Sequence, residues 1–175
     1  MEELKYPIGK LNYPGQISRS DIQSWIKDIA DFPTLLKAEV ADLTSHQLEW
    51  KYRPDGWCIR QVVHHCADSH INSQMRFKLA LTEDKPTIKP YEEALWALLP
   101  DMNSPIEWSV ELMVNLHKRW VRLLENLTDE DLTREYIHPE HGRTFNLGQT
   151  VALYSWHCRH HLAHVKQAKA AAGKY

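Results

Sequence analysis

The chain has 175 residues, of which 43% are hydrophobic and 25% charged, a composition typical of one globular domain with a sizeable core. Its net charge of −2 and the lack of a basic stripe exclude nucleic acid as the expected partner. No run of about 18 apolar residues is present, so we expect no membrane span.

Residues 1–18 are expected to form an extended N-terminal arm, because Pro7, Gly9, Pro14 and Gly15 interrupt any helical period. The opening "MEELKYPIGKLNYPG" has no apolar segment of the kind that a signal peptide needs. The cysteines are odd in number and show no CxxC spacing, which favours reduced thiols and a cytoplasmic protein. They are Cys58, Cys66 and Cys158.

The rest of the chain shows four long amphipathic helices and no strong strand pair. Ser20 is a candidate N-cap of the first helix, and Pro33 is expected to bend or reset it. A short helix is expected over "YEEALWALL". The other long helices are predicted at about 58–83, 105–127 and 146–172. This pattern predicts an all-α four-helix bundle that forms a single domain over residues 1–175.

Two segments of the chain echo one another. "LTSHQLEWKY" at 43–52 and "LTDEDLTREY" at 127–136 share the pattern Leu-Thr-x3-Leu-x3-Tyr. Thr44 with Gln47 fits a capping box, and Thr128 can cap its own turn. A duplication and the commonness of such helix starts explain the echo equally well. In either case a histidine-bearing helix follows each segment, and we expect these two helices to be neighbours.

Histidine is concentrated in two short windows, which hold seven of the eleven histidines. Residues four apart share one face of a helix, so two imidazoles at that spacing can converge on one ion. The last helix offers the pairs His157/His161 and His160/His164, and spacing does not choose between them. The third ligand would come from the upstream window, which holds His64, His65 and His70. Three histidines with an open position are typical of a catalytic site, because structural zinc sites usually have four protein ligands.

At these residues the chain resembles a known family. "GWCIRQVVHHCADSHINSQMRFKLALTE" and "YSWHCRHHLAHV" resemble the DinB superfamily of four-helix metalloproteins, and in particular its YfiT branch of metal-dependent hydrolases. "YPIGK", "KPYEEALWA" and "LHKRW" agree in order, so the resemblance covers nearly the whole chain. It implies that His65, eight positions after Trp57, joins His157 and His161 as ligands. It also implies one divalent metal per subunit, zinc or nickel, and a homodimer.

Other polar residues of the same helices are candidates for chemistry. Asp68 lies three residues after His65 and is expected on the same face, as a general base or as a carboxylate that orients a ligand. His160 and His164 could support the ligands or carry protons, and Arg76 could hold an anionic group. No HExxH motif is present, so the base would be Asp68, a spare histidine or the activated water.

The resemblance and the open position favour hydrolysis of a small-molecule substrate, with a water activated at the metal. The alternative enzyme is a metal-dependent S-transferase that uses a low-molecular-weight thiol, such as bacillithiol, for detoxification. A third possibility is a bundle that binds or senses a metal without catalysis. The residues themselves do not separate hydrolysis from thiol transfer.

Overall fold

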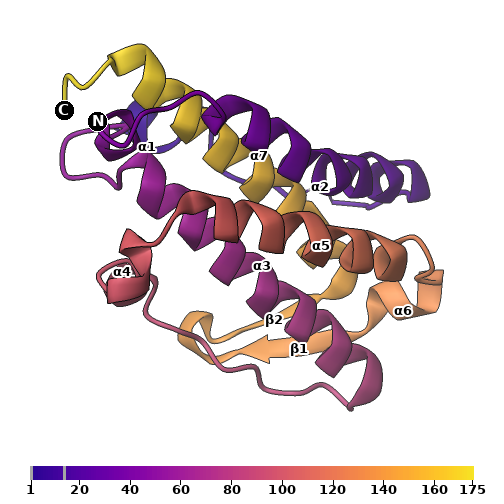
Figure 1. Ribbon diagram of the computed structural model, residues 1–175. Coiled ribbons are helices and arrows are strands. Elements are labelled where there is room, and N and C mark those ends of the chain that lie inside the picture. The colour runs from indigo at the N-terminus through magenta and orange to yellow at the C-terminus, as the bar shows by residue number, and fades with distance from the viewer. Residues whose placement is uncertain (1, 14) are drawn as a thin grey trace.

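The computed structural model describes residues 2–13 and 15–175, so Met1 and Pro14 of the predicted arm lie outside the described residues. Four long helices form a bundle, which confirms the predicted fold (Figure 1). They are α2 (Arg19–Val40), α3 (Ile59–Thr82), α5 (Ile106–Leu124) and α7 (Leu147–Ala171). The short helices are α1 (Glu2–Lys5), η1 (Gln47–Glu49), α4 (Glu93–Trp96), η2 (Pro100–Asn103), α6 (Asp129–Thr133) and η3 (Pro139–His141). None of the described helices is long and apolar enough to cross a membrane.

The start of α2 differs from the prediction. Ser18, and not Ser20, is the N-cap, because Asp21 stands three residues after it and the two exchange hydrogen bonds as a capping box. Pro33 does not reset the helix, which continues through it to Val40. The N-terminal arm is also not wholly extended, since α1 is helical.

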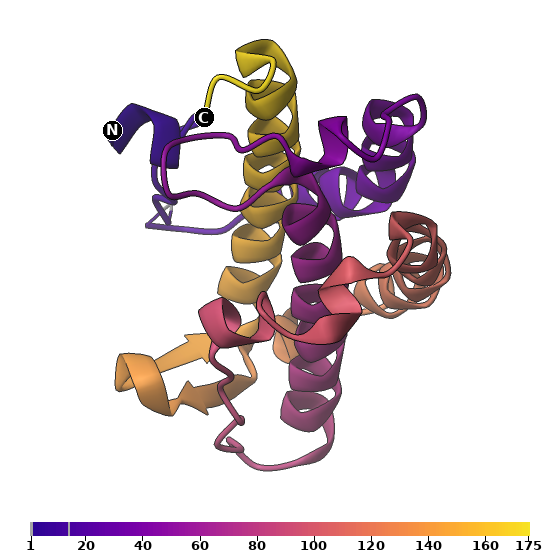
Figure 2. The same cartoon turned by 60° about the vertical axis from the view of Figure 1, so that its left-hand side comes forward.

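A β-hairpin interrupts the otherwise helical fold, and the sequence analysis missed it. Strands β1 (Glu135–His138) and β2 (Arg143–Asn146) pair antiparallel, with Tyr136 opposite Phe145. A strand of four residues is too short to show a clear alternation of polar and apolar side chains. The segment around Ile88 joins the hairpin through a backbone hydrogen bond of 3.0 Å to Ile137. The hairpin lies beside α4 (Figure 2).

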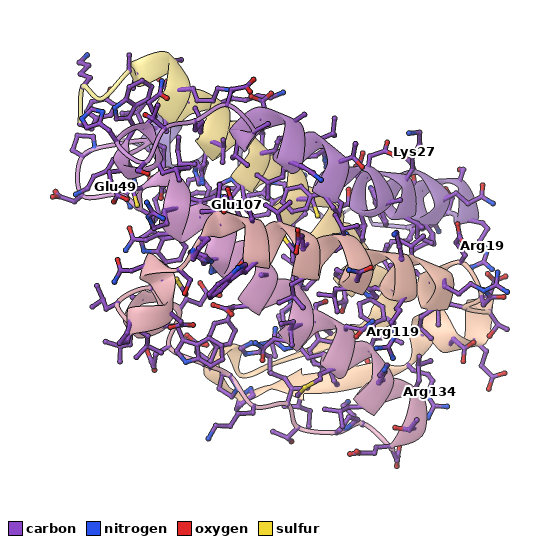
Figure 3. All side chains as sticks on the ribbon, in the orientation of Figure 1. Arg19, Lys27, Glu49, Glu107, Arg119 and Arg134 are labelled. Carbon is purple, nitrogen blue, oxygen red and sulfur yellow. The ribbon has the colours of Figure 1, made fainter. Side chains whose placement is uncertain are left out.

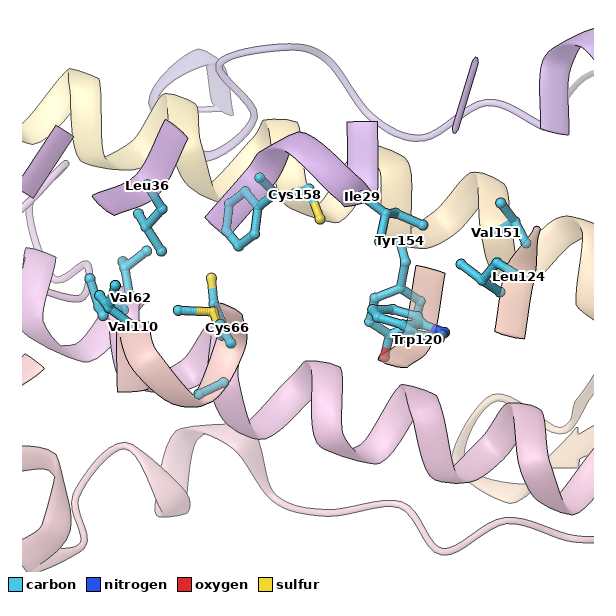
Figure 4. Close-up of a cluster of buried hydrophobic side chains, with 14 of the residues drawn as sticks. Ile29, Leu36, Val62, Cys66, Val110, Trp120, Leu124, Val151, Tyr154 and Cys158 are labelled. Atoms are coloured by element: carbon cyan, nitrogen blue, oxygen red, sulfur yellow. The ribbon is translucent and has the colours of Figure 1, made fainter. Parts of the chain in front are cut away.

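The packing order of the long helices is unusual for a bundle. α2 and α3 each pack mainly against α5 and α7, so α2 lies diagonally across the core from α3, and α5 lies diagonally from α7. The connections 41–58 and 125–146 are long enough to allow these crossings. α3 and α7 run side by side in both views, as expected for the two histidine-bearing helices (Figures 1 and 2). Cys66, Cys158, Trp120 and Tyr154 lie between the helices in the core (Figure 4).

The echoed segments have the same structural role. The N–H of Ile59, the first residue of α3, donates to the carbonyl of Trp50 at 3.0 Å. At the matching positions, the N–H of Leu147 donates to the carbonyl of Arg134 at 2.9 Å. Each segment therefore fixes the first turn of the helix that carries the histidines. The predicted capping by Thr44 and Thr128 is confirmed as well.

Candidate metal centre

Three histidines from two helices converge at one point. One ring nitrogen each of His65 on α3 and of His157 and His161 on α7 lie within 4.8 Å of one another, and the described residues hold no other such group. The Nε2 atoms of His65 and His157 are 3.3 Å apart. Two tetrahedral ligands with Zn–N bonds of about 2.0–2.1 Å are about 3.3 Å apart, so the spacing fits a metal ion. His65 and His161 are buried, and His157 is half-buried.

A chain of hydrogen bonds through buried histidines fixes the orientation of the His157 ring. The carbonyl of Ile29 on α2 can only accept, so His117 on α5 donates to it from Nδ1, at 2.7 Å. His117 then accepts at Nε2 from Nδ1 of His70, at 2.8 Å. His70 in turn accepts at Nε2 from Nδ1 of His157, at 3.1 Å. Nε2 of His157 therefore carries a lone pair, and this is the atom that faces His65.

The free carbonyl at the end of this chain follows from Pro33. In a regular helix the N–H of residue 33 would donate to the carbonyl of Ile29, and proline has no N–H. Since α2 is not broken there, the Ile29 carbonyl remains available inside the bundle and accepts from His117. Pro33, which was expected to disturb α2, thus leaves the Ile29 carbonyl available as the acceptor that orders three imidazoles.

A shorter chain has the same effect on His161. Nε2 of His164 donates to the carbonyl of Lys5, the last residue of α1, at 3.1 Å. His164 then presents a lone pair at Nδ1, which lies 3.4 Å from Nδ1 of His161. Nδ1 of His161 is the donor of that contact, and its Nε2 is left as a lone pair. The helical N-terminal segment therefore takes part in ordering the site.

Burial keeps these imidazoles neutral. It lowers the pKa of His65 to about 4, with a further contribution from His164, and it lowers the pKa of His117 to about 4. Burial also moves the pKa of His157 and of His161 well below the ordinary value, and the neighbouring histidines add to the shift. Neutral imidazoles are the form that binds a metal, so the site needs no deprotonation at neutral pH.

A polar cleft of about 630 Å³ opens beside His157. It runs between α3, α7 and the hairpin, and the side chains of Ser69, Arg76 and Tyr154 line it together with His157. The Ser69 hydroxyl is 3.4 Å from Nε2 of His157 and 3.5 Å from the Tyr154 hydroxyl. A second cavity of about 640 Å³ has mostly apolar side chains and no histidine in its lining. Of these two spaces, the first cleft is the one that reaches a histidine of the convergent group, His157.

Asp68 lies apart from the three histidines. It follows His64 by four residues, and His64 faces η2 and α5, where it contacts the Ser104 carbonyl at 3.1 Å and the Ser109 hydroxyl at 2.7 Å. Burial, with a smaller contribution from Asp101 of η2, raises the pKa of Asp68 to about 6. Asp68 does not belong to the group of three convergent histidines, and its role as a general base or as a carboxylate that orients a ligand stays a prediction.

The other candidates take several roles. His160 stacks on Trp156 with ring centroids 4.2 Å apart, and its buried Nδ1 has no hydrogen-bond partner among the described residues. Burial lowers the pKa of His160 to about 3. Arg159 forms an ion pair with Asp28 at 3.2 Å. The three cysteines are free and buried.

Four further residues complete the site, and the sequence holds a signal for three of them. Ser69 and Tyr154 follow the ligand rows of their helices, four residues after His65 and three before His157. His117 stands within the apolar stripe of α5, between Met113 and Trp120, where a histidine needs a partner. The role of His70 is visible only once α5 is placed beside α3.

Comparisons with known proteins show the family of the chain. The family model of the DinB superfamily matches residues 30–165. A protein of Oceanobacillus iheyensis with the name "Putative metal-dependent hydrolase" is 50% identical over 161 residues, 92% of this chain and 93% of that protein. A protein of Bacillus mycoides with the same name is 50% identical over 165 residues, 94% of this chain and 95% of its own.

Two solved structures are also similar. YfiT from Bacillus subtilis, described as a probable metal-dependent hydrolase with an unusual four-helix bundle topology, has a TM-score of 0.95 and 41% identity, with 98% of each chain covered. The mycothiol-dependent maleylpyruvate isomerase has a TM-score of 0.54 and 15% identity, with 82% of this chain and 60% of its own covered. The second likeness concerns the fold alone.

Proposed function

Because this chain belongs to the DinB superfamily, we propose that it is a metal-dependent hydrolase with His65, His157 and His161 as ligands of one divalent ion. The observation that carries the proposal is the convergence of three neutral imidazoles, two of which, His157 and His161, have their outer nitrogens in hydrogen-bond chains. The names of the relatives support the reaction type. Zinc and nickel both suit an imidazole site, and zinc is our first choice.

A divalent ion in this position would act as a Lewis acid and lower the pKa of a coordinated water toward about 7. The residues of the chain would orient the ligands and bind the substrate. His70 and His164 hold two ligand rings in the orientation that directs their Nε2 atoms to the ion. The hydroxyl of Ser69 lies at the cleft side of His157 and can donate to the carbonyl oxygen of an ester or amide, whereas the hydroxyl of Tyr154 donates to the Ser69 carbonyl at 3.3 Å.

Thiol transfer is a second candidate for one specific reason. The convergent group contains only histidines, and no carboxylate of the described residues belongs to it. Hydrolysis benefits from a carboxylate base near the water, whereas a thiol held at the same position would bind as its thiolate and need no base. We therefore treat transfer of a low-molecular-weight thiol to an electrophile as the alternative that an assay must separate.

The test is a paired assay of protein loaded with zinc or with nickel. One arm offers a panel of esters and amides, and the other offers bacillithiol with a reactive electrophile. Our proposal expects metal-dependent hydrolysis that is lost in His161→Ala. Turnover only in the thiol arm would reject the hydrolase and support the transferase. Absence of metal-dependent turnover in both arms would support a protein that binds a metal without catalysis.

A further inference from the structure

A buried arginine in the cleft has no partner. Arg76 on α3 is 9% exposed and lines the cleft together with His157. Among the described residues it forms no ion pair and no hydrogen bond. Arg159 on α7, which lies more in the open, is paired with Asp28. The side chain of Arg76 is thus largely withdrawn from solvent without an anion beside it, and an anionic ligand in the cleft would gain from its charge.

The surroundings of Arg76 offer hydrogen-bond donors, and among the described residues no carboxylate forms an ion pair with it. The hydroxyl of Tyr91, which lines the same cleft near Ser69, is buried and has no hydrogen-bond partner within the described part of the chain. Burial raises the pKa of Tyr91 and that of Tyr136, and the charge of Arg76 opposes both shifts, so Arg76 lies near both phenols. A guanidinium and a free phenol hydroxyl therefore face the same space. The buried hydroxyl of Tyr91 without a partner among the described residues needs an explanation, and a ligand held jointly with Arg76 provides one.

The charges at the cleft also limit what the ligand can be. Three exposed glutamates line it, and no ion pair joins Arg76 to Glu92 or Glu140 in the part of the chain that the structure describes. They are Glu92, Glu93 and Glu140. Their negative charges disfavour a second negative charge on a bound molecule, so one carboxylate suits the cleft better than a phosphate dianion. The planar fork of a guanidinium also matches the two oxygens of a carboxylate.

We propose that Arg76 and Tyr91 bind a carboxylate of the substrate, which makes the substrate class small esters or amides that carry one acidic group. This inference rests on the proposed function for the reacting bond. Ser69, beside His157, and Arg76 are seven residues apart on α3, which is about 10 Å along the helix. The acidic group therefore lies at a distance from the reacting carbonyl that a short aliphatic or aromatic spacer can bridge.

The test compares two esters that differ only in the remote group. Zinc-loaded protein is assayed with 4-nitrophenyl hydrogen glutarate and with its methyl ester, which lacks the negative charge. Arg76→Met should lower kcat/KM for the acidic ester by about 10- to 100-fold and leave that for the methyl ester nearly unchanged. Arg76→Lys, which keeps the charge, should lose less. The matched control is Arg119→Met, at an exposed arginine of α5 (Figure 3).

Binding measurements separate this inference from the hydrolase itself. Calorimetry should detect binding of benzoate by the wild type and by Arg119→Met, and none by Arg76→Met, with the same zinc content in all three. Absence of ester turnover together with Arg76-dependent benzoate binding would sink the hydrolase and keep the carboxylate site. Equal loss on both esters, benzoate binding that survives in Arg76→Met, or phosphate bound as tightly as benzoate would overturn the site.

Discussion

The buried hydrogen-bond chain that runs from the Ile29 carbonyl to His157 leads to a prediction. His117, which has no access to the metal, should control the affinity of the site for the metal. His117 is 2% exposed and is separated from His157 by His70. His117→Phe keeps an aromatic ring in the core but removes both of its hydrogen bonds. His70 is then free to adopt the other tautomer and donate from Nε2, which places a hydrogen on Nε2 of His157. We expect zinc to bind more weakly because that tautomer has no lone pair to offer.

The size of the effect follows from the contacts that are lost. An outer partner of a metal-bound histidine usually contributes 10- to 100-fold in affinity, which is about 1.4–2.8 kcal/mol. Stability should fall as well, since the Ile29 carbonyl and Nδ1–H of His70 lose partners at 2.7 Å and 2.8 Å, at about 1–3 kcal/mol for each buried group. Pro33→Ala should have a smaller effect, because a carbonyl has two lone pairs and can accept from residue 33 and from His117 together.

Zinc affinity is measured by competition with a chromophoric chelator, and stability by urea unfolding of the metal-free protein. His117→Gln is the rescue variant, since its amide can accept from His70 and donate to Ile29. His64→Phe is the control, because His64 is also buried and doubly hydrogen-bonded but lies outside the chain. Nitrogen NMR should find Nδ1–H tautomers for His70 and His117 in the wild type. The reasoning fails if His117→Phe binds zinc as the wild type does, or if His64→Phe weakens zinc binding equally.

Three further predictions concern ligands, charge and helix capping. His65→Ala should purify without stoichiometric metal, whereas exposed His46→Ala should keep it; full metal occupancy in His65→Ala by elemental analysis would remove His65 from the ligand set. The pKa of Asp68 is raised to about 6 in the folded chain from about 3.9 unfolded, so its contribution to stability decreases as the pH rises from about 4 to 6. Asp68→Asn should therefore be more stable at pH 7, by about 1–2 kcal/mol after allowance for partial exposure, and unfolding at pH 4 and 7 checks the sign. Asn146→Ala should lower the free energy of unfolding by about 1 kcal/mol, because the N-cap of α7 is lost, and an unchanged urea midpoint would contradict this.

Local sequence patterns predicted most of the fold and about half of the candidate site. The helical period placed α3, α5 and α7 within a few residues, because the apolar stripe of a helix is written in residues three and four apart. The same spacing put His157 and His161 on one face but left His160 and His164 as an equal alternative. Resemblance to the family, and not the spacing, selected the pair that the folded chain brings to His65.

The tertiary structure alone decided what stands behind and beside those histidines. A sequence pattern shows which face of a helix is buried, but it does not show which other helix covers that face. The diagonal order of the bundle brings α5 to α3, and only then does His117 meet His70. The same holds for Arg76, whose burial without a partner depends on side chains from the hairpin and from the segment before α4. The spacing of residues within one helix shows which histidines can share a metal ion. The direction of a hydrogen bond and the pairing of a charge depend on contacts between elements, and the distance between residues along the chain says nothing about those contacts.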